Sequence, residues 1–366
     1  MSAERAVDAL LTDGPSAPAG AVVGIASPTG RDVAAGGYAI MTSARMTVDT
    51  AFDVASVTKV AATTTALLTL ASRGSIRFDD PVDSYLPTTA CAPGTTLRHL
   101  LQHRAGLWEW QPLYLAPGDP AAAIDALPLR YPLDHARHYS DLGFLLLGRI
   151  ISVVTDAPLD AAVRELVTEP LGLSRTGFGP VPAPVASSAR GDDAERRMVA
   201  RGEPYPVLAP HRDFAWRDAE ITGVANDGNC FHAFGGVAGH AGLFSTADDL
   251  LTLGAALAAP DEHADLWHPA AVTDLFGDGP DRGQALGWRS RDVRLDDEGE
   301  DERMLWHPGF TGCALGIVPA TGTAVVMLSN RLLAPEPAPT DALWLTALAA
   351  LRGDQTSRDT EGTRTP

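Results

Sequence analysis

The sequence of 366 residues predicts an α+β protein in which one antiparallel sheet is assembled from the two ends of the chain. Strand-like segments occur near both ends, whereas residues 81–276 contain mainly helical patterns joined by loops rich in proline and glycine. A hydrophobic fraction of 45% can bury a substantial core. We therefore expect a single catalytic domain over residues 1–352. Its α/β lobe comprises residues 1–80 and 280–352, and a helical lobe is inserted at 81–279.

The first elements of the chain are a helix and a hairpin. Residues 1–11 have the pattern of a short amphipathic helix. Two apolar runs, at residues 21–26 and 33–38, flank the turn sequence Ser-Pro-Thr-Gly at 27–30. This arrangement predicts a hairpin that belongs to a buried sheet.

The helix after Phe52 carries the residues on which the functional interpretation depends. Apolar residues recur at helical spacing as far as Ala71, and Gly74 stands where a C-terminal cap belongs. Ser56 lies at the N-terminal end, where the helix dipole favours a developing oxyanion. Lys59 is the single lysine of the sequence, since the other 27 of its 28 basic residues are arginines. Residues three apart share a helix face, and a desolvated lysine can act as a base whereas an arginine cannot.

The central region is expected to be helical with one long insertion. Thr95 and Thr96 precede a helical pattern that stops at Gly106, and a second helix is predicted at residues 141–154. Residues 187–219 are polar and rich in arginine and proline. We interpret them as a long surface or lid-like insertion, a kind of loop that often carries specificity.

The pattern returns to strands near the C-terminus, at residues 286–289, 304–318 and 323–328. The acidic run at residues 295–302 is expected to be a solvated hairpin tip. A final helix is predicted at residues 341–352, and residues 353–366 are expected to form a disordered tail.

Charge and composition exclude several classes of partner. Lys+Arg 28 against Asp+Glu 46 gives a net charge of −18, which argues against nucleic acid and anionic membranes as partners. No apolar run reaches the ~18 residues of a membrane span. Residues 1–13 lack the pattern of a signal peptide, so a cytoplasmic location is expected. Ten histidines occur without HExxH or comparable ligand spacing, and we expect neither a metal nor a cofactor.

Two further stretches accompany Ser56 and Lys59. Tyr139-Ser140-Asp141 immediately precedes a predicted helix, and His307-Pro308-Gly309 lies in a C-terminal strand before Phe310. In this order the three stretches resemble the SxxK, YxN and KTG or HxG motifs of the serine β-lactamase and penicillin-binding-protein superfamily. The glycine-rich block at residues 235–246 is similar to one in its class C-type members. The resemblance spans about residues 15–350 and implies the β-lactamase/transpeptidase-like fold.

The resemblance also implies roles for individual residues. Ser56 would attack an acyl carbonyl, and Lys59 and Tyr139 would jointly remove and return its proton. The backbone N–H groups of Ser56 and Phe310 would form the oxyanion hole. A free lysine titrates near 10.4, so the pKa of Lys59 would have to fall toward ~7–8, and burial acts in that direction.

Substrate contacts are expected from Asp141, His307 and Gly309, the last because a side chain there would crowd the substrate path. Asp141 replaces the more familiar asparagine. It can serve as a helix N-cap, or it can touch Lys59, raise the lysine pKa and shift the base role toward Tyr139. His307 replaces the lysine that anchors the carboxylate of β-lactams, and a mostly neutral histidine holds a carboxylate less firmly.

The sequence therefore predicts a cofactor-independent serine hydrolase that forms an acyl-enzyme through Ser56 on a small ester or amide. The departure at His307 favours a carboxylesterase or D-amino-acid peptidase with weak or no β-lactamase activity. The alternatives are an acyltransferase on the same fold and a non-catalytic binding or regulatory protein. We expect His103 and His240 to be structural rather than catalytic, and the sequence leaves the oligomeric state open.

Overall fold

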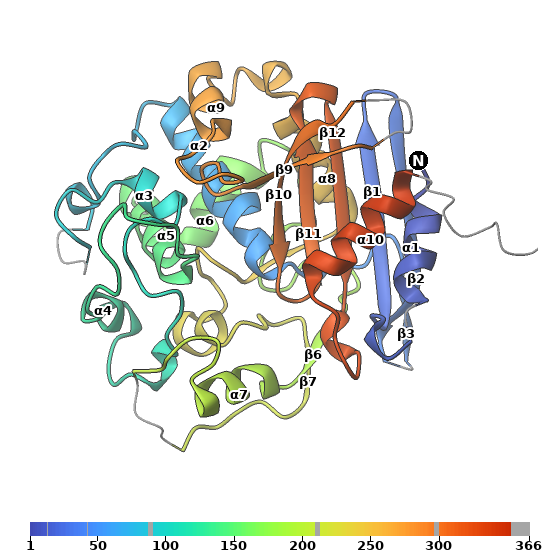
Figure 1. Cartoon of the computed structure of the whole chain (residues 1–366), viewed down its shortest axis with the longest axis horizontal. Helices are drawn as coiled ribbons and strands as arrows, with labels where there is room; N and C mark the ends of the chain where they lie inside the picture. Colours follow the sequence, from blue (N-terminus) through green and yellow to red (C-terminus); the bar gives the residue numbers. More distant parts are fainter. Residues whose placement is uncertain (13, 42, 87–90, 209–212, 296–299, 353–366) are drawn as a thin grey trace, which may run out of the picture.

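The computed structural model describes residues 1–12, 14–41, 43–86, 91–208, 213–295 and 300–352. Within these residues the largest sheet has seven antiparallel strands in the order β3-β2-β1-β12-β11-β10-β9 (Figure 1). Its central neighbours β1 and β12 come from opposite ends of the chain and pair from Ala21↔Ser329 to Ala26↔Ala324. The expected sheet built from both termini is confirmed. Its strands are β1 (Gly20–Ser27), β2 (Gly30–Ile40), β3 (Ala44–Arg45), β9 (Arg289–Val293), β10 (Glu302–Gly309), β11 (Cys313–Val318) and β12 (Thr323–Ser329).

Helices cover both faces of this sheet. The terminal helices α1 (Ala3–Leu11) and α10 (Thr340–Arg352) pack together on the outer face, where they bury apolar residues such as Trp344 with the sheet (Figure 1). On the other face α8 (Ala247–Ala258) contacts β1, β11 and β12. Because β1 and β12 are covered on both faces, side chains on both faces of these strands are buried and their sequences are nearly continuous apolar runs.

The inserted lobe is mainly helical and shares the larger hydrophobic core with the inner face of the sheet. Two small sheets, β4-β8-β5 and β6-β7, lie beside its helices. Helix α2 (Thr65–Ser72) precedes this lobe, whose helices include α3 (Leu97–Leu101), α4 (Pro120–Asp125), α5 (Asp141–Thr155), α6 (Leu159–Val163), α7 (Asp193–Arg201) and α9 (Pro269–Phe276). The short strands are β4 (Phe52–Asp53), β5 (Gly177–Phe178), β6 (Ser187–Arg190), β7 (Glu220–Thr222) and β8 (Leu243–Ser245).

Several element boundaries differ from those expected. The helix after Phe52 is composite: a 3₁₀ turn at Ala55–Val57 and a π-helical segment at Lys59–Thr64 precede α2. Helix α3 stops before Gly106, since His103 already has a φ of 60°. The strand expected at 304–318 is two strands, β10 and β11, because the chain reverses at Gly312 with a φ of 107°.

Other expectations concern segments that are described only in part. The strand expected at 286–289 begins at Arg289 instead. The insertion at 187–219 contains β6 and α7, but residues 209–212 lie outside the described residues. Most of the acidic run at 295–302 and all of the tail at 353–366 also lie outside them.

In the described part of the chain, no helix is by itself long and apolar enough to cross a bilayer. Helix α5 and the helical segment Leu159–Thr168 meet that requirement only together, as a pair bent by 77°.

Candidate active site

Ser56 lies on a strained turn between β4 and the first buried helix. The preceding residue, Ala55, has a φ of 47°, a conformation that is costly for a residue with a Cβ atom. The Asp53 carboxylate holds this turn by accepting the N–H of Ala55 at 2.8 Å and the N–H of Asn226 at 2.6 Å. These two hydrogen bonds connect the turn that carries Ser56 to a loop far away in the sequence.

Lys59 is fully buried beneath Ser56. Its Nζ donates to Ser56 Oγ at 2.9 Å and to the backbone oxygen of His240 at 3.2 Å, and it lies 2.7 Å from Asp141 Oδ1. The expected meeting of the Ser56 and Lys59 side chains is therefore confirmed. The catalytic roles of these residues stay predictions.

The pKa of Lys59 follows the alternative in which Asp141 touches the lysine and raises its pKa. Burial lowers the lysine pKa, but the Asp141 carboxylate and the Tyr139 phenol raise it by more, so that it lies above its usual 10.5. Desolvation is the largest single effect, but the charges and hydrogen bonds of Asp141 and Tyr139 together exceed it, so the pKa does not fall toward the value that a lysine base would need. Lys59 is therefore a cation at neutral pH.

Asp141 is the first residue of α5, and Ser140 is the N-cap. Ser140 Oγ accepts the N–H of Gly143 at 3.2 Å. Of the two roles considered for Asp141, the structure shows the contact with Lys59, whereas Ser140 is the N-cap of the helix. An ion pair in this place compensates two charges that would be costly to bury singly.

Tyr139 stands beside the lysine, with its ring centroid 5.0 Å from Lys59 Nζ. The buried His103 supports it from behind: the two ring centroids are 4.6 Å apart, and His103 Nδ1 accepts the N–H of Ser140 at 3.0 Å. Burial, aided by the charges of Arg137 and Lys59, lowers the pKa of His103 well below 6.5. A neutral His103 that places Tyr139 agrees with the expected structural role.

His307 lies on β10 with only 1% of its surface exposed. Its Nδ1 donates to the backbone oxygen of Pro308 at 2.9 Å, and its ring centroid is 6.0 Å from that of Tyr139. Burial, followed by the charges of Lys59 and Arg289, lowers the pKa of His307 well below 6.5. The histidine is neutral, as expected, but it does not line the cavity in front of Ser56.

Gly309 has a different role from the expected one. A Cβ atom at this position would collide with the backbone oxygen of Val54 and come within 3.5 Å of Ala55 Cβ. The bare Cα therefore lets the end of β10 lie against the turn that carries Ser56. The expectation that Gly309 keeps a substrate path open is corrected: it keeps a backbone contact, and it is not among the residues that line the cavity.

We expect Gly309→Ala to lower the free energy of unfolding by about 1–3 kcal/mol, because the new methyl group overpacks a backbone contact. It should also slow acylation, since relief of the collision moves the Ser56 turn. Thermal unfolding and the rate of fluorophosphonate labelling measure the two effects. Gly177→Ala is the control, because a Cβ at this strand position meets nothing within 4 Å. Equal behaviour of the two variants would contradict the packing argument.

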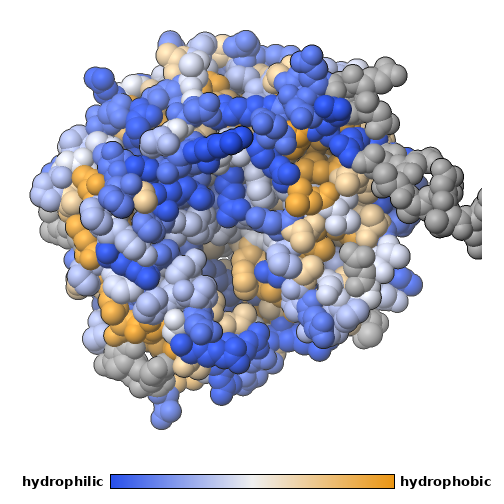
Figure 2. All heavy atoms as spheres, in the orientation of Figure 1, coloured by the Kyte–Doolittle hydropathy of each residue, from blue (hydrophilic) through white to orange (hydrophobic). Residues whose placement is uncertain are grey.

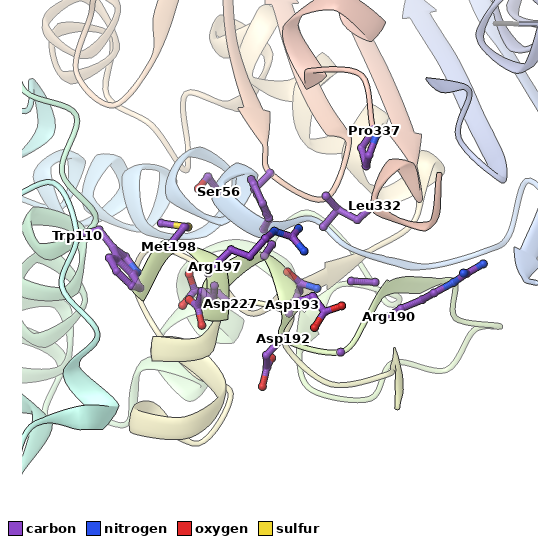
Figure 3. Close-up of a pocket in the computed structure, with 18 of the residues that line it drawn as sticks. Ser56, Trp110, Arg190, Asp192, Asp193, Arg197, Met198, Asp227, Leu332 and Pro337 are labelled. Atoms are coloured by element: carbon purple, nitrogen blue, oxygen red, sulfur yellow. The ribbon is translucent and has the colours of Figure 1, made fainter. Parts of the chain in front are cut away.

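A cavity of about 570 Å³ opens onto Ser56 (Figure 3). Helix α7 and its flanking residues form one wall, so the insertion at 187–219 reaches the site. Residues 332–337, which follow β12, form the opposite wall, and Phe310 lies at the edge with 49% of its surface exposed. Figure 2 shows the molecular surface hollowed between the sheet and the helical lobe.

Asp227 and His240 form a second polar pair beside the lysine. His240 Nε2 lies 2.9 Å from Asp227 Oδ1, which also accepts the N–H of Cys230 at 2.7 Å. Burial raises the pKa of Asp227, but His240, the Cys230 N–H and the charge of Lys59 together bring it below 3.8. Possible ligand atoms of Asp141, Asp227 and His240 lie within 4.8 Å of one another. Lys59 already supplies a cation at this donor set, 2.7 Å from Asp141.

The buried Asp53 is expected to make the free energy of unfolding depend on pH. Burial raises its pKa from 3.8 to about 6, against the hydrogen bonds from Asn226 and Ala55. Because the folded protein holds the Asp53 proton more tightly than the unfolded chain does, protonation of Asp53 stabilises the fold. This contribution to the free energy of unfolding is fully present below pH 3.8 and is lost as pH rises through about 6. The difference corresponds to about 3 kcal/mol at most.

The prediction compares the free energies of unfolding of the wild type and of Asp53→Asn. We expect the wild-type value to fall relative to that of the variant by up to about 3 kcal/mol between pH 4 and pH 7. Urea unfolding at intermediate pH values measures this difference, in which the titration of other groups cancels. A difference that stays constant with pH would show that Asp53 does not titrate in this range.

Two residues that shape the site, Asp53 and Asp227, are not among those predicted from the sequence. Asp53 stands three residues before Ser56 and could have been found as a buried acid beside the motif. Asp227 has no local signal, because its position depends on the contact with His240.

Comparison with known proteins identifies the family. The model of the Beta-lactamase family matches residues 7–350. An Escherichia coli (strain K12) protein, provisionally named as a D-alanyl-D-alanine carboxypeptidase, is 29% identical over 321 residues, which cover 80% of this chain and 71% of that protein. The N-acetylmuramyl-L-alanine amidase of Bacillus subtilis (strain 168) is 28% identical over 322 residues, which cover 80% and 70%.

The fold is similar to that of solved structures. A class C beta-lactamase from Rhodobacter sphaeroides superimposes with a TM-score of 0.67 at 22% identity, and the match covers 95% of this chain and 97% of the other. The likeness confirms the β-lactamase/transpeptidase-like fold expected from the three motifs. With its family match and its Ser56–Lys59 contact, the chain belongs to the beta-lactamase family of serine hydrolases.

Proposed function

We propose that this protein is a serine hydrolase that forms an acyl-enzyme through Ser56 on a small ester or amide. The observation that carries the proposal is the hydrogen bond of 2.9 Å between the buried Lys59 and Ser56 Oγ. It occurs on a turn that opens into a cavity of about 570 Å³. A nucleophile activated by a neighbouring group at the floor of a cavity is the arrangement that covalent catalysis requires.

The proton path follows from the charge of Lys59. Because the lysine is already protonated, it cannot accept the proton of Ser56, and this role passes to Tyr139. As Ser56 Oγ attacks the acyl carbon, its proton moves to the Tyr139 oxygen while the phenolic proton of Tyr139 moves to the leaving group. The Lys59 cation stabilises the negative charge that develops on Ser56 Oγ.

The second half of the reaction reverses these transfers. Water attacks the acyl carbon, its proton moves to Tyr139, and the phenolic proton returns to Ser56 Oγ. The N–H groups of Ser56 and Phe310 hold the carbonyl oxygen in both steps. Phe310 suits this role because it directly follows β10 and lines the cavity together with Ser56.

An ester or amide of the D-amino-acid peptidase type is favoured over a β-lactam. The neutral His307 lies outside the cavity and offers no fixed cation from β10 to a β-lactam carboxylate. The names of the E. coli and B. subtilis relatives refer to cleavage of amide bonds, which supports an amide substrate.

The proposal is tested by exposing the protein to a fluorophosphonate, a short-chain p-nitrophenyl ester and a chromogenic cephalosporin, followed by intact mass measurement and peptide mapping. We expect one adduct on the peptide that contains Ser56 and faster turnover of the ester than of the cephalosporin. No adduct, under conditions that fully label a control serine hydrolase, would mean that the protein is a non-catalytic member of its family.

A further inference from the structure

The cavity is lined by several acids, but most of their charge is compensated within the protein. Asp141 pairs with Lys59 at 2.7 Å, and Asp192 pairs with Arg217 at 2.6 Å. Glu195 is half-buried, and burial together with the charge of Asp227 raises its pKa well above 4.5. The cavity is thus less acidic than its composition indicates, although the exposed Asp193 in its lining has no ion-pair partner among the described residues.

Arg197 is a cation in this wall, one helical turn after the exposed Asp193 on α7. It lies on α7, lines the cavity and is exposed. Across the described residues, its guanidinium makes no ion pair and no hydrogen bond to an acid. Figure 3 shows its side chain extended along the cavity below Ser56, whereas Arg190, which also borders the cavity, points away from it.

Apolar groups surround this cation. Figure 3 shows Met198 and Trp110 on one side of the cavity and Leu332 and Pro337 on the other. Leu333 also lines it. A ligand that fills this space would combine an apolar body with an anionic end. The net charge of −18 does not attract anions from a distance, so selection of an anion would depend on direct contact with an arginine.

We propose that Arg197 binds a carboxylate of the substrate, and that the enzyme prefers esters or amides with an apolar body and a free carboxylate. The planar guanidinium of arginine can hold a carboxylate through two parallel hydrogen bonds. The insertion at 187–219 thereby supplies the cation that β10, with its neutral His307, does not provide. This inference rests on the proposed acyl-enzyme chemistry at Ser56.

The test compares two matched pairs of substrates. One pair is the p-nitrophenyl monoester of glutaric acid and p-nitrophenyl pentanoate, which differ in a carboxylate on the acyl side. The other is a thioester with a thioglycolate leaving group and its thioglycolamide counterpart, which differ in a carboxylate on the leaving group. We expect wild type to prefer the carboxylate in at least one pair, which also tells on which side of the scissile bond Arg197 lies.

In that pair, Arg197→Gln should lower the ratio of kcat/KM for the charged and neutral substrates about tenfold, mainly through KM. High salt should weaken the wild-type preference, since the arginine is exposed. Arg196→Gln is the matched control, because Arg196 is the neighbouring exposed arginine on α7 and does not line the cavity. Ratios in Arg197→Gln equal to those of wild type in both pairs would overturn the proposal.

A binding measurement distinguishes failure of the proposed hydrolase chemistry from failure of the proposed carboxylate site. If wild type turns over none of these substrates, the glutarate ester is titrated calorimetrically into Ser56→Ala and into Ser56→Ala/Arg197→Gln. Binding that is about tenfold weaker in the double variant supports the carboxylate site even though the hydrolase proposal has failed. Equal binding by both variants, or no binding, overturns the site.

Discussion

Ser56→Ala is expected to reduce turnover of a p-nitrophenyl ester by at least about 10³-fold and to abolish the mass adduct. The alanine variant keeps the cavity and the Lys59–Asp141 ion pair, so substrate can still bind, but no oxygen remains to attack the acyl carbon. Steady-state rates and intact mass spectra measure the effect. The small size of the substitution leaves the core around the turn filled, and we expect little change in thermal stability.

Ser75→Ala serves as the control, since Ser75 is exposed just beyond the end of α2 and makes no contribution to the cavity. It should retain wild-type turnover. If Ser56→Ala hydrolysed the ester at the wild-type rate, the Ser56–Lys59 contact would be an inherited feature of the scaffold without a catalytic role.

Lys59→Gln is expected to lower the rate of Ser56 acylation by about 10²–10⁴-fold. The substitution removes the cation that lies 2.9 Å from Ser56 Oγ, where negative charge develops during the attack. It also leaves the Asp141 carboxylate without its partner, and this unpaired charge should destabilise the fold. Rapid-mixing measurements of the fluorophosphonate reaction and thermal unfolding separate the two consequences.

The double variant Lys59→Gln/Asp141→Asn provides the control for the unpaired charge. Because both charges are removed, it should regain most of the stability lost in Lys59→Gln, whereas the acylation rate should stay low. Recovery of the rate along with the stability would show that Lys59 acts by holding the structure together rather than by stabilising the transition state.

The sequence by itself determined the fold class and the members of the proposed catalytic group. Apolar runs at both ends predicted the sheet in which β1 and β12 pair, because strand periodicity is a property of neighbouring residues. Helical spacing brought Ser56 and Lys59 together, since residues three apart share a helix face whatever surrounds the helix. Such local rules do not require knowledge of the rest of the chain.

Tertiary structure alone decided the protonation of Lys59, the purpose of Gly309 and the presence of Arg197 in the cavity wall. The lysine stays charged because α5 brings Asp141 to within 2.7 Å of it. Gly309 is required by the backbone of Val54 on another element, and Arg197 arrives on an insertion without recognisable periodicity. Coulomb energies and steric contacts depend on distances through space, which separation along the chain does not specify.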